Sequence, residues 1–193
     1  LIEELAPDVP VAIHLDHGQT YADTVAAVRA GFTSIMCDGS DLPIDENIAL
    51  TRKVVEMAAA VGISVEAEIG QLLKGEADPD SPLIVQLDDV RKFNEAVKVD
   101  MLAVAIGNSH GYYKGEPQIN MRRLKEVRDC TDIPLVLHGC TGIPEEIVRA
   151  CIKNGMAKIN FGTMLRNNYL TYFDEGYRET DHQGHPWRVM QYA

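Results

Sequence analysis

The sequence has 193 residues, of which 46% are hydrophobic and 24% charged, and its formal net charge is −11. A chain of this length can bury the core of one ordinary domain. The negative charge, with no basic cluster to offset it, argues against a nucleic-acid partner, and an anionic substrate would need a local site. The sequence has no apolar run that could span a bilayer, so no membrane partner is expected. Four widely spaced cysteines favour a reducing, cytoplasmic location over a disulfide scaffold.

Short apolar runs alternate with longer amphipathic segments along the whole chain. The predicted strands are residues 11–15, 34–37, 64–69, 101–105, 134–137 and 157–161. The predicted helices are residues 21–30, 45–61, 87–97, 121–129 and 144–154, and a last one begins at residue 163. This alternation is typical of βα units around a parallel sheet. No linker or repeat divides the sequence, so we expect a single domain over residues 1–193.

Most residues that could perform chemistry follow the predicted strands at their carboxyl ends. In a (β/α)₈ barrel the active site is built at that face from several strands. The pattern therefore favours a TIM barrel over an open sheet. Six units are two fewer than the fold needs, and about 250 residues are typical of the complete barrel. We expect an incomplete (β/α)₈ barrel that lacks the first two βα units, with a gap between strands 11–15 and 157–161.

The connection over residues 70–85 is longer than most loops between a strand and a helix. It carries two glycines, two prolines and several acidic residues. Loops of this kind are often lids over active sites. Because this loop has few apolar anchors, we expect it to be poorly ordered without substrate.

Three histidines occur in the same context, each near the end of a predicted strand and directly before a glycine. They are His17 in L-D-H-G, His110 in N-S-H-G and His138 in V-L-H-G. Three imidazoles with an open fourth position form a common catalytic zinc site. A single histidine at a strand end is more often structural, but the repeated context favours a metal site. His14 lies inside its predicted strand, which indicates core packing or a contact with a metal ligand.

Taken together, these motifs resemble class II, metal-dependent fructose-bisphosphate aldolases, in particular the branch that includes tagatose-bisphosphate and other ketose-bisphosphate aldolases. The resemblance runs through H-L-D-H-G, S-V-E-A-E-I-G, A-V-A-I-G-N-S-H-G-Y-Y-K-G-E-P, L-V-L-H-G-C-T-G-I-P and K-I-N-F-G-T. It implies a (β/α)₈ barrel that assembles as a homodimer or homotetramer and acts on a small sugar phosphate. The implied cofactor is Zn²⁺, and a monovalent cation or a second divalent ion is a further candidate.

Carried over position by position, the resemblance makes His17, His110 and His138 the zinc ligands. Asp16 becomes the acid/base residue that handles the C4 hydroxyl proton during cleavage of the C3–C4 bond. Zinc would polarise the ketone of dihydroxyacetone phosphate as a Lewis acid. A structural alternative for Asp16 is a cap for the next helix.

Four acidic residues complete the implied site. Glu76, in the long loop, matches a mobile glutamate that removes a proton from dihydroxyacetone phosphate, although the usual Gly-Gly pair of this loop is absent and a solvated acid is the alternative. Asp38 and Glu68 match acids near the metal that bind a second ion or orient the histidines. Glu66 lies on the same strand face as Glu68 and could belong to the site. The alternative is that it is a polar residue in one of the side-chain layers inside the barrel.

The resemblance also implies a phosphate-binding region made of backbone amides and hydroxyls. Its residues are Gly111, Gly139, Cys140, Thr141, Asn160, Phe161, Gly162 and Thr163. A helix that opens at Gly162 and Thr163 suits an anion, whereas turn glycines and a helix cap are the structural alternative. Fructose-bisphosphate enzymes typically read N-x-D-T, but this sequence reads N-F-G-T. The missing carboxylate favours tagatose-type or other ketose phosphates.

The sequence therefore predicts a zinc-dependent aldolase, an aldehyde-lyase that reversibly cleaves a ketose (bis)phosphate. The products would be dihydroxyacetone phosphate and an aldehyde such as glyceraldehyde 3-phosphate. One alternative is a non-catalytic barrel subunit that supports a partner aldolase. Another is a metal-dependent hydrolase on a similar barrel, with water in the open metal position.

Overall fold

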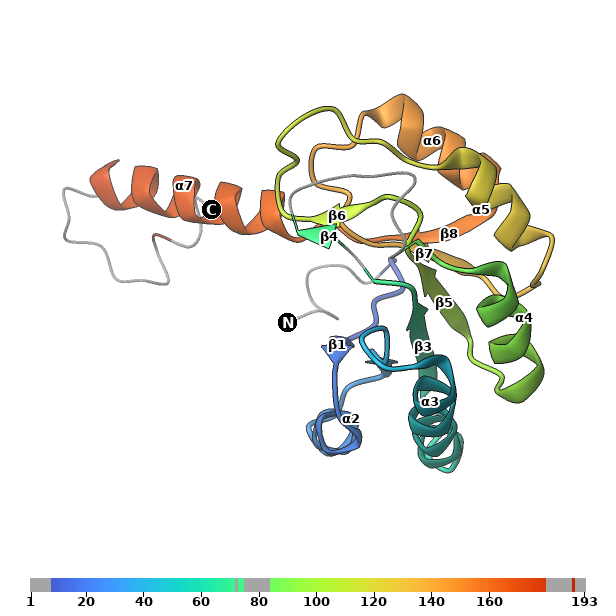
Figure 1. The fold of residues 1–193 in the computed structure, drawn as a ribbon. Helices are drawn as coiled ribbons and strands as arrows, with labels where there is room; N and C mark the ends of the chain where they lie inside the picture. The colour runs from blue at the N-terminus through green and yellow to red at the C-terminus, as the bar shows by residue number, and fades with distance from the viewer. Residues whose placement is uncertain (1–7, 72, 75–83, 180–188, 190–193) are drawn as a thin grey trace.

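The computed structural model describes residues 8–71, 73–74, 84–179 and 189 and contains one curled, six-stranded parallel sheet (Figure 1). Its strands, in spatial order, are β1 (His14–Gly18), β2 (Ser34–Cys37), β3 (Ser64–Ile69), β5 (Met101–Val104), β7 (Leu135–Leu137) and β8 (Met156–Ile159). Two short strands, β4 (Leu73–Lys74) and β6 (Ser109–His110), pair with each other. The helices are α2 (Tyr21–Arg29), α3 (Ile44–Ala59), α4 (Leu87–Ala96), α5 (Met121–Arg128), α6 (Glu145–Lys153) and α7 (Thr163–Glu179).

The predicted alternation of strands and helices is confirmed. Each strand of the large sheet pairs in parallel with the next of these strands along the chain, as expected for successive βα units. β1 and β8 lie at opposite edges of this sheet, which confirms the predicted arc with its two separated edges. Among the described helices, none is long and apolar enough to cross a membrane.

The first predicted strand is wrong by three residues at each end. The apolar run over residues 11–15 indicated the strand, but β1 covers His14–Gly18, and Val11 and Ile13 are exposed. β1 is an edge strand, and in the described sheet it pairs only with β2. Its limits are therefore set by where it can pair with β2 and not by where the apolar run lies. Asp16 and His17 therefore lie within the strand and do not follow it. The pairing shifts register between Leu15 and Gly18, and His17 has a φ of 54°, in the left-handed region.

The two faces of the sheet have different contents because side chains alternate along each strand. One face packs against the helices, and its buried strand residues in the main core are Ile35, Cys37, Val65, Ala67, Ile69, Leu102, Val104, Leu135, Leu137 and Met156. The other face carries a small separate cluster of Met36, Ala103 and Val136. Glu66 and Glu68 alternate with the core residues of β3 and are nonetheless buried. This second face, the inner face of the curled sheet, thus supplies polar groups of the site.

A local hydrogen-bond pair fixes the exit of the chain from β1. The Thr20 hydroxyl accepts a hydrogen bond from the Asp23 N–H at 3.1 Å, and the Asp23 carboxylate accepts one from the Thr20 N–H at 2.9 Å. This reciprocal capping box starts α2 at Tyr21, so only two residues separate it from the end of β1. The direction of the chain just beyond His17 is therefore set locally.

Helix α7 differs from the other helices because it projects away from the sheet (Figure 1). Leu124, on α5, is fully buried in the core, whereas Leu170, on α7, is 63% exposed.

We predict that Leu124→Ala lowers the free energy of unfolding by about 2–5 kcal/mol, since it leaves a cavity in a packed core. Leu170→Ala, the matched control, should change it by no more than about 0.5 kcal/mol. Urea unfolding followed by circular dichroism checks this, and equal losses in the two variants would contradict the packing described.

Candidate metal centre and active site

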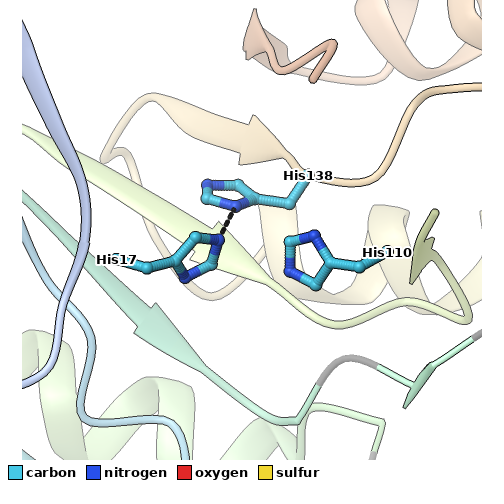
Figure 2. Close-up of side chains that lie close together, drawn as sticks. All are labelled: His17, His110 and His138. Atoms are coloured by element: carbon cyan, nitrogen blue, oxygen red, sulfur yellow. Dashed lines mark hydrogen bonds between the residues drawn. The ribbon is translucent and has the colours of Figure 1, made fainter. Parts of the chain in front are cut away.

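The three histidines that share a sequence context come together at one end of the sheet (Figure 2). His17 lies in β1, His110 lies in β6, and His138 directly follows β7. One ring nitrogen from each residue lies within 4.8 Å of the others. The ring centroid of His17 lies 4.9 Å from that of His110 and 4.8 Å from that of His138. Residues far apart in the sequence therefore form one compact group of nitrogen donors.

The donor geometry fits a tetrahedral metal ion of the zinc type. The Nε2 atom of His17 and the Nδ1 atom of His138 are 3.1 Å apart (Figure 2). Two nitrogens bound to zinc at about 2.0–2.1 Å in tetrahedral geometry would be separated by about 3.3–3.4 Å. Three imidazoles also leave one coordination position open. The three nitrogen donors and this one N···N distance are thus compatible with a tetrahedral metal ion.

Carboxylates hold the other ring nitrogens of two of these histidines. The Nδ1 atom of His17 lies 2.6 Å from Oδ2 of Asp38, and the Nε2 atom of His138 lies 2.8 Å from Oε1 of Glu66. Such partners fix the orientation and tautomer of an imidazole that binds a metal. They leave Nε2 of His17 and Nδ1 of His138 facing the common centre.

Charges around the centre keep these carboxylates ionised. Burial raises the pKa of Asp38, but its hydrogen bonds with His17 and Ser40 outweigh burial and lower that pKa to about 2. Burial likewise raises the pKa of Glu66, and hydrogen bonds from His138 and Lys158 lower it overall. The Nζ atom of Lys158 lies 2.8 Å from Oε2 of Glu66. Both carboxylates can therefore accept hydrogen bonds from the histidines at neutral pH.

A second group of possible ligands consists of His17, Asp38 and Glu68, whose ligand atoms also lie within 4.8 Å of one another. Glu68 is buried, and its Oε2 atom lies 3.7 Å from Nδ1 of His17 without a hydrogen-bond partner. Burial raises the pKa of Glu68 well above its usual range, and Asp38 and Glu66 raise it further. The structure therefore brings Asp38 and Glu68 together beside His17, and Asp38 contacts the Nδ1 atom of that ring.

His14 and His110 have contrasting surroundings. The Nδ1 atom of His14 lies 2.8 Å from the Ser34 hydroxyl, and its Nε2 atom lies 3.6 Å from Oε2 of Glu66. His14 therefore lies beside the carboxylate that contacts His138. Burial lowers the pKa of His110, and the nearby His17 and His138 lower it further. His110 is thus neutral near pH 7 and has a free electron pair for a cation.

Asp16 lies beside the metal position without belonging to either ligand group. Its Oδ1 atom is 4.0 Å from Nε2 of His17, and its side chain is 58% exposed. The Asn160 amide donates a hydrogen bond to the same oxygen at 3.4 Å. The alternative that Asp16 caps the next helix is wrong, because Thr20 is the cap of α2.

A cavity of about 640 Å³ opens next to the histidines. It is lined by Asp16, His17, His110, Gly111, His138, Gly139, Thr141, Asn160, Gly162, Thr163 and Arg166. Six of the eight predicted phosphate-binding residues line it, and Cys140 and Phe161 do not. Cys140 is buried and its N–H donates to the Asn160 carbonyl at 3.2 Å, whereas Phe161 is exposed.

Arg166 was missed by the sequence analysis. It lies one helical turn after Thr163 in α7, and its guanidinium donates a hydrogen bond to the Thr163 hydroxyl at 3.4 Å. The T-x-x-R spacing could have revealed it, because residues three apart share a helix face. Glu76, the predicted mobile base, lies outside the described residues, as does most of the loop over residues 70–85.

Comparison with known proteins agrees with this geometry. The family model described as class II fructose-bisphosphate aldolase matches residues 1–192. The chain belongs to the class II fructose-bisphosphate aldolase family. A fructose-bisphosphate aldolase from Geobacillus stearothermophilus is 47% identical over 166 residues, and a 6-phospho-5-dehydro-2-deoxy-D-gluconate aldolase from Bacillus velezensis is 46% identical over 166 residues. Each match covers 84% of this chain but only 58% and 57%, respectively, of the relative.

Solved structures of class II aldolases have the same fold. The YdjI aldolase from Escherichia coli K12 superposes with a TM-score of 0.76 at 36% identity, covering 98% of this chain and 67% of the other. The fructose-bisphosphate aldolase from Campylobacter jejuni gives a TM-score of 0.68 at 26% identity, covering 91% and 58%. The curled sheet is thus part of an aldolase TIM-barrel fold, as the sequence predicted.

The contact between His17 and Asp38 predicts how zinc affinity depends on pH. Burial lowers the pKa of His17, but the hydrogen bond to Asp38 and the nearby carboxylates outweigh burial and raise it above 6.5. Zinc competes with the proton that His17 binds when it becomes charged, so zinc affinity should fall as the pH drops through the raised pKa of His17. In Asp38→Asn the partner has no charge, and the midpoint of the affinity profile should move to lower pH.

Chelator competition from about pH 6 to about pH 8 measures this profile. Asp45→Asn is the control, because it removes the same charge from an exposed ion pair with Lys92 on α4. An unshifted midpoint in Asp38→Asn would show that Asp38 does not govern the proton on His17.

Proposed function

We propose that this chain carries the active site of a zinc-dependent aldolase that reversibly cleaves a ketose phosphate to dihydroxyacetone phosphate and an aldehyde. The observation that carries the proposal is the convergence of His17, His110 and His138 beside Asp16 in the lining of one cavity. A zinc site alone would serve many reactions. The adjacent carboxylate and the anion-binding features of the cavity are what favour an aldolase.

The substrate class is broader than fructose bisphosphate. The relatives named fructose-bisphosphate aldolase and 6-phospho-5-dehydro-2-deoxy-D-gluconate aldolase are 47% and 46% identical to this chain, so overall identity favours neither substrate. Both names specify a phosphorylated substrate. The glycine at position 162, in place of the carboxylate of N-x-D-T, supports a tagatose-type or other ketose phosphate.

The start of α7 supports binding of the phosphate group. Gly162, Thr163 and Arg166 all line the cavity there. The free N–H groups of a helix N-terminus and its dipole favour an anion, and a guanidinium is well suited to phosphate. The Thr141 hydroxyl accepts a hydrogen bond from the Met164 N–H at 3.2 Å and ties the loop after β7 to this helix. A local cradle of this kind would let a chain with a net charge of −11 bind a sugar phosphate.

The proposed proton transfer uses Asp16. When zinc is bound by the three histidines, it supplies Lewis-acid polarisation of the substrate ketone. Asp16 then accepts the C4 hydroxyl proton as the C3–C4 bond breaks, C4 becomes the aldehyde carbon, and the bonding electron pair stays with the dihydroxyacetone phosphate fragment. We propose that Glu76 gives a proton to the C3 carbon of that fragment during cleavage and removes it from dihydroxyacetone phosphate in the reverse reaction.

Three further attributes belong to the same proposal. We expect a homodimer or homotetramer, a cytoplasmic location, and a monovalent cation or second divalent ion as an additional cofactor. The four cysteines are free in the structure, and a reducing compartment would keep them so. The group formed by His17, Asp38 and Glu68 supports the additional cation.

We predict that Asp16→Ala lowers the rate of C–C cleavage about 10²- to 10⁴-fold while zinc stays bound, because Asp16 transfers a proton and does not ligate the metal. His17→Ala is the contrasting variant and should lose zinc as well as activity. Zinc content and aldehyde release from a panel of ketose phosphates are measured for both. Equal zinc loss in the two variants would contradict the assigned roles, and release of inorganic phosphate without C–C cleavage would indicate a hydrolase.

A further inference from the structure

The segments that carry His110 and His138 are in direct backbone contact. Gly139, the residue after His138, has a φ of +68°, which favours glycine. A Cβ atom at this position would lie 2.1 Å from the carbonyl oxygen of Ser109, the residue before His110. A side chain has no room between the two segments, so their separation is determined at this contact.

Two side chains link the segments across this contact. The Tyr113 hydroxyl accepts a hydrogen bond from the Ser109 N–H at 2.9 Å and donates one to the Gly139 carbonyl at 3.0 Å. The Asn108 amide donates to the His138 carbonyl at 3.0 Å, and its oxygen accepts from the Ile106 N–H at 2.9 Å. The successive carbonyls of His138 and Gly139 are therefore both bound by the segment over residues 108–113, which includes His110.

The sheet itself does not fix this separation. In the described sheets β6, which contains His110, pairs with β4, while β7, which precedes His138, pairs with β5 and β8. Asn108 is buried, where an amide needs its hydrogen bonds satisfied. Burial raises the pKa of Tyr113 to about 12, so its hydroxyl keeps the proton that it donates.

We propose that Asn108 and Tyr113 are positioning residues that set the distance between His110 and His138 and thereby the affinity of the three-histidine site for a divalent cation. This inference rests on the metal site proposed above. Neither side chain is among those that line the cavity, so each acts through the backbone of the ligand segments. Partners of metal ligands commonly change metal affinity by about 10- to 100-fold.

The test uses the whole chain and zinc alone as the probe. Tyr113→Phe removes only the hydroxyl that joins Ser109 to Gly139. Tyr112→Phe is the matched control, because it makes the same change one residue earlier on a side chain that is 53% exposed. We expect Tyr113→Phe to raise the dissociation constant for zinc about 10-fold or more. We also expect it to change the visible absorption of the cobalt(II) form, which reports ligand geometry, whereas Tyr112→Phe should match the unaltered protein in both measurements.

Comparing the variants with the unaltered protein distinguishes failure of the positioning role from failure of the proposed function. If the unaltered protein binds zinc and Tyr113→Phe binds it as tightly as Tyr112→Phe, the positioning role is overturned while the aldolase proposal stands. If the unaltered protein does not bind zinc, both are overturned. Circular dichroism of the metal-free proteins provides the folding control. An unfolded metal-free Tyr113→Phe would overturn the positioning role, because the hydroxyl would then support the fold and not the ligand spacing.

Discussion

The arrangement of the site depends on one fully buried carboxylate, that of Glu66. Removing an ion from water costs several kcal/mol, so a buried carboxylate is stable only when charged or hydrogen-bonding groups surround it. Here the His138 ring and the Lys158 ammonium, each at 2.8 Å, contact its two oxygens. These contacts join β3, β8 and the residue after β7. The same interaction that satisfies the buried charge therefore fixes which nitrogen of His138 faces the metal position.

Strand geometry explains why Glu66 is available for this role. Successive side chains of β3 point to opposite faces, so Val65, Ala67 and Ile69 enter the core against the helices while Glu66 and Glu68 face inward. Because the strands are parallel, their carboxyl ends meet at one edge of the sheet, and this edge collects the ligand-bearing segments. A short acid-x-acid pattern thus supplies both a partner for His138 and a carboxylate near His17.

Much of this could be predicted from sequence because the signals are local. Five of the six predicted strands and all six predicted helices show apolar periodicity that matches the structure to within two residues at each predicted end. The three H-G dipeptides identified the candidate ligands. β1 was misplaced because the limits of an edge strand depend on its pairing with β2, which the apolar run over residues 11–15 does not encode.

The contacts that were not predicted connect residues distant in the sequence. The sequence did not decide whether Glu66 belongs to the site or is only a polar residue inside the barrel. Its partners, His138 and Lys158, are 72 and 92 positions away in the sequence. The bond from Tyr113 to the Gly139 carbonyl spans 26 positions and involves backbone, which carries no residue-specific signal. Orientation of ligands thus follows from tertiary contacts, whereas the identity of the ligands follows from local motifs.

The most direct test of the account is a crystal structure of the zinc-loaded protein with anomalous diffraction at the zinc edge. The account predicts a peak about 2.0–2.1 Å from Nε2 of His17, Nδ1 of His138 and one ring nitrogen of His110, with Glu66 still bonded to Nε2 of His138. A zinc ion bound through Nε2 of His138, with Glu66 no longer hydrogen-bonded to that nitrogen, would contradict it. Zinc bound elsewhere, with the three histidines free of metal, would contradict it equally.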